Sequence, residues 1–102
     1  MFGNLAAMAS AIKQAKEIQG NVKRIREDMA QSSFEGFAGD NRTKATVTGD
    51  LRVVSIEIAP DAGSAAGELA AAAVNSAMDN AKRTLQQRIR EAAGGLDLPD
   101  LF

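Results

Sequence analysis

The chain has 102 residues, with 12 lysines and arginines against 13 aspartates and glutamates, and it has no histidine, cysteine, tryptophan or tyrosine. Without thiols and imidazoles it can form no disulfide, zinc finger or Ser-His-Asp triad, and a metal ion would find only carboxylate oxygens. A net charge of -1 excludes the uniformly basic surface of many nucleic-acid binders. The length predicts one domain. The hydrophobic core of so short a chain alone provides little stability, so a second subunit would help to stabilise the fold.

The N-terminal third predicts one long helix over residues 4–31, with Asn4 as its N-cap. Apolar residues recur there in steps of three and four: Met8, Ala11, Ala15, Ile18, Val22, Ile25 and Met29. Because this spacing fills the a and d positions of a seven-residue repeat, it predicts left-handed supercoiling against another helix. The helix would be roughly 40 Å long, so part of it should project from a domain of this size.

Residues 33–59 predict a meander of three antiparallel strands. The second strand alternates, with Thr43, Ala45 and Val47 on one face. Gly39-Asp40-Asn41 predicts the first turn, and Gly49-Asp50 predicts a hairpin turn with glycine in the first position.

The third strand is rich in β-branched residues and should end before Pro60. Strict alternation places Ile56 and Ile58 on one face together with Val54, and Val53 on the other face. A sheet of three strands with one apolar face needs a helix laid over that face.

A second long helix is predicted over residues 64–93, from a possible N-cap at Ser64 to a stop at Gly94-Gly95. Its apolar stripe comprises Ala70, Val74, Ala77, Met78, Ala81, Leu85, Ile89 and Ala92. The alanine run at 70–73 would let this helix approach a sheet or a helix closely. The predicted fold is therefore α+β in the order α-β-β-β-α, with a single domain over residues 1–95 and a tail over 96–102.

Charge is unevenly distributed along the chain, because both helices are net basic while the sheet segment and the tail are net acidic. Each helix contains a run of cations; the two runs comprise Lys13, Lys16, Lys23, Arg24 and Arg26, and Lys82, Arg83, Arg88 and Arg90. A charge run on a helix is usually only a solvated face. Convergence of both runs, in a dimer, on one surface would instead indicate a site for a phosphate backbone.

Several kinds of site are not found in the sequence. No P-loop or GxGxxG motif occurs, and no constellation of catalytic side chains is visible, so we expect a non-enzymatic protein without a cofactor or metal. The opening residues lack a basic and apolar leader pattern, and no stretch approaches the roughly 18 apolar residues of a membrane span. These features predict a cytoplasmic protein without a membrane partner.

Six segments of the chain, in order, resemble the bacterial YbaB/EbfC family of nucleoid-associated proteins. They are Met1-Phe2-Gly3-Asn4, Lys13-Gln14-Ala15-Lys16, Val47-Thr48-Gly49, Ile56-Glu57-Ile58-Ala59-Pro60, Ala72-Ala73-Val74-Asn75-Ser76-Ala77, and the ending from Gly94-Gly95-Leu96 through Leu98-Pro99-Asp100-Leu101-Phe102. The resemblance implies a tweezer-like homodimer of α-β-β-β-α subunits that binds duplex DNA in the nucleoid and affects nucleoid organisation or gene expression. It also implies that the nine helix cations are the DNA-binding residues.

Two features depart from the family pattern. Asp40 lies in a turn that is richer in glycine in the family, and Asp97 and Asp100 add negative charge to the tail. Both departures disfavour DNA binding. The near-neutral net charge, the acidic sheet and tail, and the apolar ending Leu101-Phe102 support an alternative function, a dimeric protein-interaction module whose helices hold a protein partner and which does not bind DNA strongly.

Overall fold

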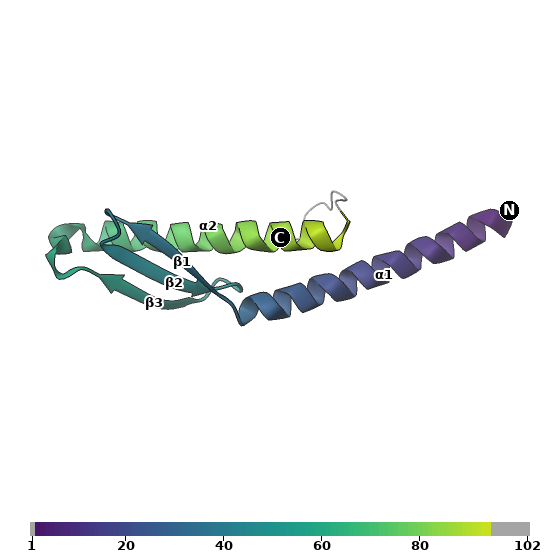
Figure 1. The fold of residues 1–102 in the computed structure, drawn as a ribbon, viewed down its shortest axis with the longest axis horizontal. Coiled ribbons are helices and arrows are strands. Elements are labelled where there is room, and N and C mark those ends of the chain that lie inside the picture. The colour runs from purple at the N-terminus through teal and green to yellow at the C-terminus, as the bar shows by residue number, and fades with distance from the viewer. Residues whose placement is uncertain (1, 95–102) are drawn as a thin grey trace.

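The computed structural model describes residues 2–94 of the chain. Its elements are helix α1 (Phe2–Ala30), strands β1 (Ser33–Ala38), β2 (Thr43–Thr48) and β3 (Val53–Ile58), the short 3-10 helix η1 (Pro60–Ala65) and helix α2 (Ala66–Ala92). The strands form one antiparallel sheet in the order β1-β2-β3. The predicted order of a helix, three strands and a second helix is thereby confirmed (Figure 1).

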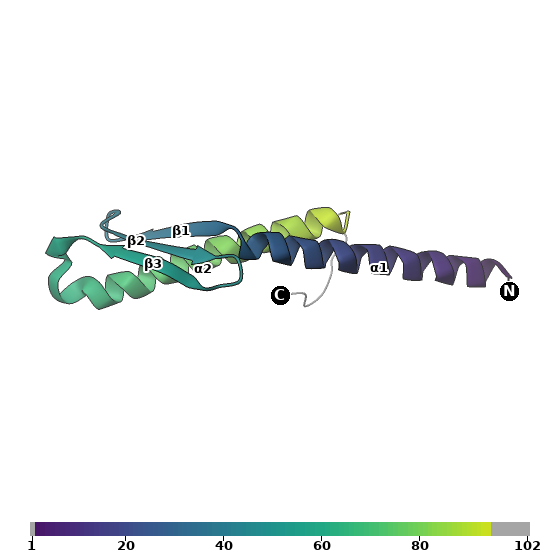
Figure 2. The same ribbon diagram turned by 90° about the horizontal axis from the view of Figure 1, so that it is seen from below.

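The molecule is elongated, with extents of 72 × 21 × 15 Å. Both helices extend past the same end of the sheet, and α1 continues well past the end of α2 (Figures 1 and 2). The expectation that part of the first helix projects from the domain is confirmed.

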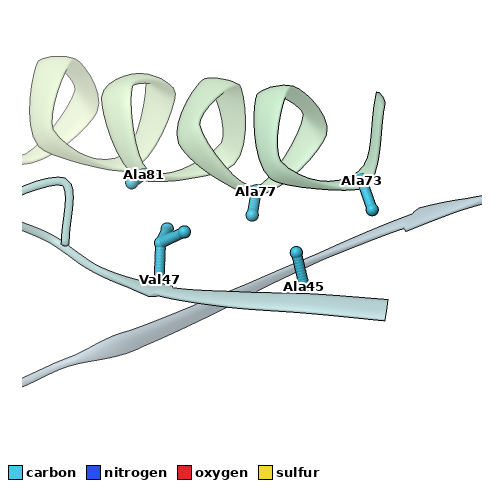
Figure 3. Close-up of a cluster of buried hydrophobic side chains, with 5 residues drawn as sticks. All are labelled: Ala45, Val47, Ala73, Ala77 and Ala81. Carbon is cyan, nitrogen blue, oxygen red and sulfur yellow. The ribbon is translucent and has the colours of Figure 1, made fainter. Parts of the chain in front are cut away.

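The core lies between α2 and one face of the sheet. It is built mainly from small side chains, which point toward one another in Figure 3: Ala45, Val47, Ala73, Ala77 and Ala81. A Cβ atom on Gly36 of β1 would lie closer than 3.0 Å to the backbone of Ala73 and Ala77. Helix α2 therefore packs directly on the backbone of the sheet, which only glycine and alanine allow at this distance.

The predicted stripe on α2 is partly right. Ala77, Ala81 and Ile89 are buried as expected, whereas the other five members, Ala70, Val74, Met78, Leu85 and Ala92, are only half-buried. Ala73 and Ala93 are buried although the stripe did not include them. Ala73 is covered because Gly36 brings the strand backbone against the helix at that point.

The C-terminal half of α1 contacts α2, and this contact buries the corresponding part of the heptad stripe. Val22 and Met29 are buried on α1, as is Ile89 near the end of α2. By contrast, Met8 at the other end of the stripe is 60% exposed. The chain's own second helix therefore covers only half of the stripe.

Both predicted N-caps are wrong. Helix α1 already begins at Phe2, so Asn4 lies inside its first turn. Ser64 lies in η1, and the N-cap of α2 is Ala65, which makes no side-chain capping hydrogen bond. The chain first forms a 3-10 turn after Pro60, interrupted by the left-handed Gly63 (φ 59°), and this turn delays the start of the α-helix.

The β2–β3 hairpin has a different turn from the one expected. The left-handed residue is Leu51 (φ 64°), not Gly49. Gly49 instead lies against the end of α1, where its N–H donates to the carbonyl oxygen of Met29 over 2.9 Å, and a Cβ atom on it would clash with that carbonyl group. The glycine is therefore required for close packing. The β1–β2 turn is as predicted, with positive φ at all three residues of Gly39-Asp40-Asn41.

The predicted alternation in β3 is wrong at its first residues. Ala45 pairs with Ile56, but Val47 pairs with Val53, so Val54 is an extra residue in a β-bulge. Val53 consequently shares a face with Ile56 and Ile58. Helix α2 lies mainly over β1 and β2, and these three β3 side chains remain 40–47% exposed.

Candidate nucleic-acid interface

The three cations of the sheet segment are all neutralised by neighbouring carboxylates. Arg42 lies 3.1 Å from Asp61, and Arg52 Nε lies 3.8 Å from Asp50. Lys44 is on β2, and its Nζ lies between acids of the two flanking strands, 3.4 Å from Glu57 on β3 and 3.7 Å from Glu35 on β1. These cations are engaged within the protein and are poorly available to an anionic partner.

Lys44 shows the electrostatic effect of this pairing. A side-chain hydrogen bond to Glu57 and the negative charges of Glu35 and Glu57 raise the pKa of Lys44 above its usual 10.5, although partial desolvation opposes the shift. Its three-residue cluster crosses all three strands on the face of the sheet opposite α2. We interpret this face as a structural, solvated surface.

The nine helix cations differ from the three sheet cations in their ion pairing. All are exposed, and none forms an ion pair with another residue in the 2–94 range. Arg83 donates a hydrogen bond to the side-chain oxygen of Asn80, whose amide nitrogen donates to the backbone oxygen of Glu35 over 2.7 Å. Arg83 is thus held by a neutral group and keeps its charge available.

One cation from each run lines a common cavity. Arg26 of α1 and Lys82 of α2 line the same cavity, of about 500 Å³, at the junction of the helices with the β2–β3 hairpin. Its other lining residues are Gly49, Asp50, Leu51, Leu85 and Gln86. The close contact between Gly49 and Met29 brings the hairpin to this junction.

The remaining cations are not gathered in that cavity. Lys13 and Lys16 line a shallow hollow on α1 with Ala9, Ile12 and Glu17, to which α2 contributes no residue. The other five, Lys23, Arg24, Arg83, Arg88 and Arg90, lie exposed along the two helices and line neither hollow.

The sequence did not point to Asp50, Leu51 and Gln86 as members of a site. Each lies in an ordinary turn or helix pattern, and only the contact between the hairpin and α1 brings them together. The glycine at position 49 was the available signal, but it is equally typical of a turn.

The same part of the chain lacks two other kinds of feature, a metal site and a membrane span. Residues 2–94 contain no group of three or more acidic side chains placed to hold a metal ion. Neither helix combines the length and apolarity needed to cross a membrane.

Comparison with known proteins identifies the family of this chain. Residues 4–96 match the model of the YbaB/EbfC DNA-binding family. A nucleoid-associated protein of Thermoanaerobacter pseudethanolicus is 36% identical over 89% of this chain and 86% of its own length. Nucleoid-associated proteins of a Cyanothece and a Nostoc species are each 32% identical, over 98% and 96% of this chain and 91% and 89% of their own lengths. The chain therefore belongs to the YbaB/EbfC DNA-binding family.

Proposed function

We propose that this protein binds duplex DNA as a homodimer, through contacts from the nine helix cations to the phosphate backbone. It acts in the bacterial nucleoid, on nucleoid organisation and gene expression, and catalyses no reaction. The proposal combines family membership with the relatives' printed description as nucleoid-associated proteins.

The observation that carries the proposal is the contrast between paired and unpaired cations. Every cation of the sheet segment has a carboxylate partner, and none of the cations on α1 and α2 has one within residues 2–94. Unpaired, exposed cations can replace the counterions condensed on a duplex, and release of these counterions favours binding. A net charge of -1 therefore understates the basic character of the two helices.

The same side chains imply low sequence specificity. Contacts to phosphates position a protein on DNA but do not read its bases. The protein has no tryptophan or tyrosine, and no aromatic residue of the 2–94 segment lines the cavity shared by both helices. We therefore assign affinity mainly to backbone electrostatics.

The homodimer part of the proposal is supported by the part of the sheet, at β3, that α2 leaves uncovered. Val53, Ile56 and Ile58 form an apolar row on β3, and this strand pairs with β2 alone in the 2–94 structure. A monomer that leaves both the row and the strand edge in water exposes a surface suited to association. A second copy related by a two-fold axis would present the same row and edge, and would cover both.

The test is fluorescence anisotropy with two unrelated duplexes at several salt concentrations. We expect similar affinities for both, with dissociation constants of roughly 10⁻⁴ to 10⁻⁶ M at physiological salt, and a log-log salt slope of about -0.9 per neutralised phosphate. The double variant Arg83→Glu/Arg90→Glu should bind more weakly and with a flatter slope.

The matched control is Arg42→Glu/Arg52→Glu, which changes the net charge equally but affects only cations paired within the sheet segment. It should bind more tightly than the helix variant. Equal losses in both variants would remove Arg83 and Arg90 from the site. Absence of binding by the unmodified protein at low salt would favour the protein-interaction alternative, for which a nuclease-resistant, stoichiometric protein partner is expected.

A further inference from the structure

The junction cavity combines two chemical features that a DNA backbone alone does not match. Arg26 and Lys82 supply positive charge, while Leu51 and Leu85 supply apolar surface. Asp50, the one acid among the described residues of its lining, is already engaged, because it accepts a hydrogen bond from the Thr48 hydroxyl and lies near Arg52. The cavity therefore suits a ligand that carries both carboxylates and aliphatic groups.

We propose that this ligand is the protein's own C-terminal segment, residues 96–102, docked in the cavity of the same chain. The segment reads Leu96-Asp97-Leu98-Pro99-Asp100-Leu101-Phe102 and lies beyond the described residues. It combines acidic and apolar side chains and carries a charge of -2 from Asp97 and Asp100. Its carboxylates complement the two cations, and its leucines and phenylalanine complement the two leucines of the lining.

The end of α2 lies close enough to the cavity for this segment to reach it. Gly94 adopts a left-handed conformation (φ 67°), and its N–H donates to the carbonyl oxygen of Glu91 over 3.1 Å, which closes the helix. From Gly94 back to Gln86 the helix measures about 12 Å. The four residues 95–98 span about 13 Å when extended. Residues 98–102 can therefore lie level with Gln86, at the cavity.

Docking would place the Asp100 carboxylate, with Asp97 just before it, beside Arg26 and Lys82, one cation from each run. If the proposed DNA-binding function holds, the docked segment competes with phosphates for this pair of cations. The docking itself does not depend on DNA, and it is tested without DNA so that the two proposals can fail separately.

The natural chain contains no cysteine, so a pair of introduced thiols reports their proximity directly. The test variant is Pro99→Cys/Gln86→Cys, which keeps the acids, the leucines and the phenylalanine of the segment. The control is Pro99→Cys/Thr46→Cys, because Thr46 points to the opposite face of the sheet from the buried Ala45 and Val47. The rate of disulfide formation is measured at low protein concentration in a mild oxidant, with the products separated on a non-reducing gel.

We expect the Gln86 pair to form an intrachain disulfide at least tenfold faster than the Thr46 pair. Lys82→Glu in the same background should slow this reaction several-fold, and added salt should act in the same direction. Arg83→Glu is the matched control, since Arg83 is the next residue on α2 and does not line the cavity. Equal rates at Gln86 and Thr46, equal effects of both charge reversals, or disulfides formed between chains would each overturn the proposal.

Discussion

The backbone of Gly36 on β1 lies directly against the backbone of Ala77 on α2, with no room for a side chain between them. This contact sets the distance between the helix and the sheet, and it explains why the core consists so largely of alanine. With few large side chains to bury, the core depends on the closeness of this packing.

Gly36→Ala should therefore destabilise the fold strongly. The added methyl group would lie closer than 3.0 Å to backbone atoms, which cannot move aside as a flexible side chain would. We expect a loss of roughly 3 kcal/mol in the free energy of unfolding, measured by urea denaturation. The control is Gly67→Ala, on the same helix as Ala77 but with open space around the new Cβ. It should be neutral or stabilise the fold by up to about 1 kcal/mol.

Two methionines at equivalent positions of the heptad stripe should respond differently to truncation. Met29 is 1% exposed, so Met29→Ala should cost roughly 2–5 kcal/mol through lost burial and a residual cavity. Met8 is 60% exposed, and Met8→Ala should change the free energy of unfolding by less than about 0.5 kcal/mol. Urea midpoints of the two variants provide the comparison. A cost at Met8 as large as that at Met29 would show that a partner helix covers the distal stripe.

A charge placed in the apolar row of β3 should weaken the proposed homodimer. Ile56→Asp would bring a carboxylate into the surface that we expect to be buried between two copies. Sedimentation at micromolar concentration should show a dimer for the unmodified protein and a shift toward monomer for the variant. Ser55→Asp is the control, because it introduces the same charge at the next position, on the opposite face of the strand. A monomeric unmodified protein would contradict the dimer.

The Lys44 cluster should contribute to stability in a pH-dependent way. Because the folded protein holds the pKa of Lys44 above its usual 10.5, the protonated form is favoured by folding. Its stabilising contribution should be complete below pH 10.5 and should disappear as the pH rises through the higher folded pKa.

Lys44→Met would remove this contribution, so its urea midpoint should fall below that of the unmodified protein under neutral conditions and approach it at alkaline pH. Lys23→Met, which affects an exposed lysine without an ion pair in the 2–94 segment, provides the reference. A constant difference between the Lys44 variant and the unmodified protein at every pH would contradict the prediction.

The sequence predicted those features that depend on local periodicity. The alternation of Thr43, Ala45 and Val47 is confirmed, since each is fully buried under α2. Val53 was assigned to the wrong face, because the bulge at Val54 arises from pairing with β2 and leaves no local mark on β3. The N-cap predictions were wrong for a similar reason. Residue types that cap helices also occur at many other positions, and the flanking chain decides where the helix begins.

The candidate site was predictable only in part. The two cation runs are visible in the sequence, but the shared cavity of Arg26 and Lys82 results from a tertiary contact between the hairpin and the end of α1. Gly49 is central to that contact, and sequence reasoning assigned it a different role, in the conformation of the turn. Long-range packing of this kind has no periodic signature.

Because Gly49 contacts Met29 in the last turn of α1, a small change at this contact would be amplified along the length of the helix. The helix has 29 residues and is anchored at one end, where the hairpin backbone touches its last turn. Its length is roughly 43 Å, so a rotation of about 10° at this contact would displace the far tip by about 7 Å, more than one helical turn. A single methyl group at position 49 would therefore act at a distance, displacing Lys13 and Lys16 of α1 without touching either residue.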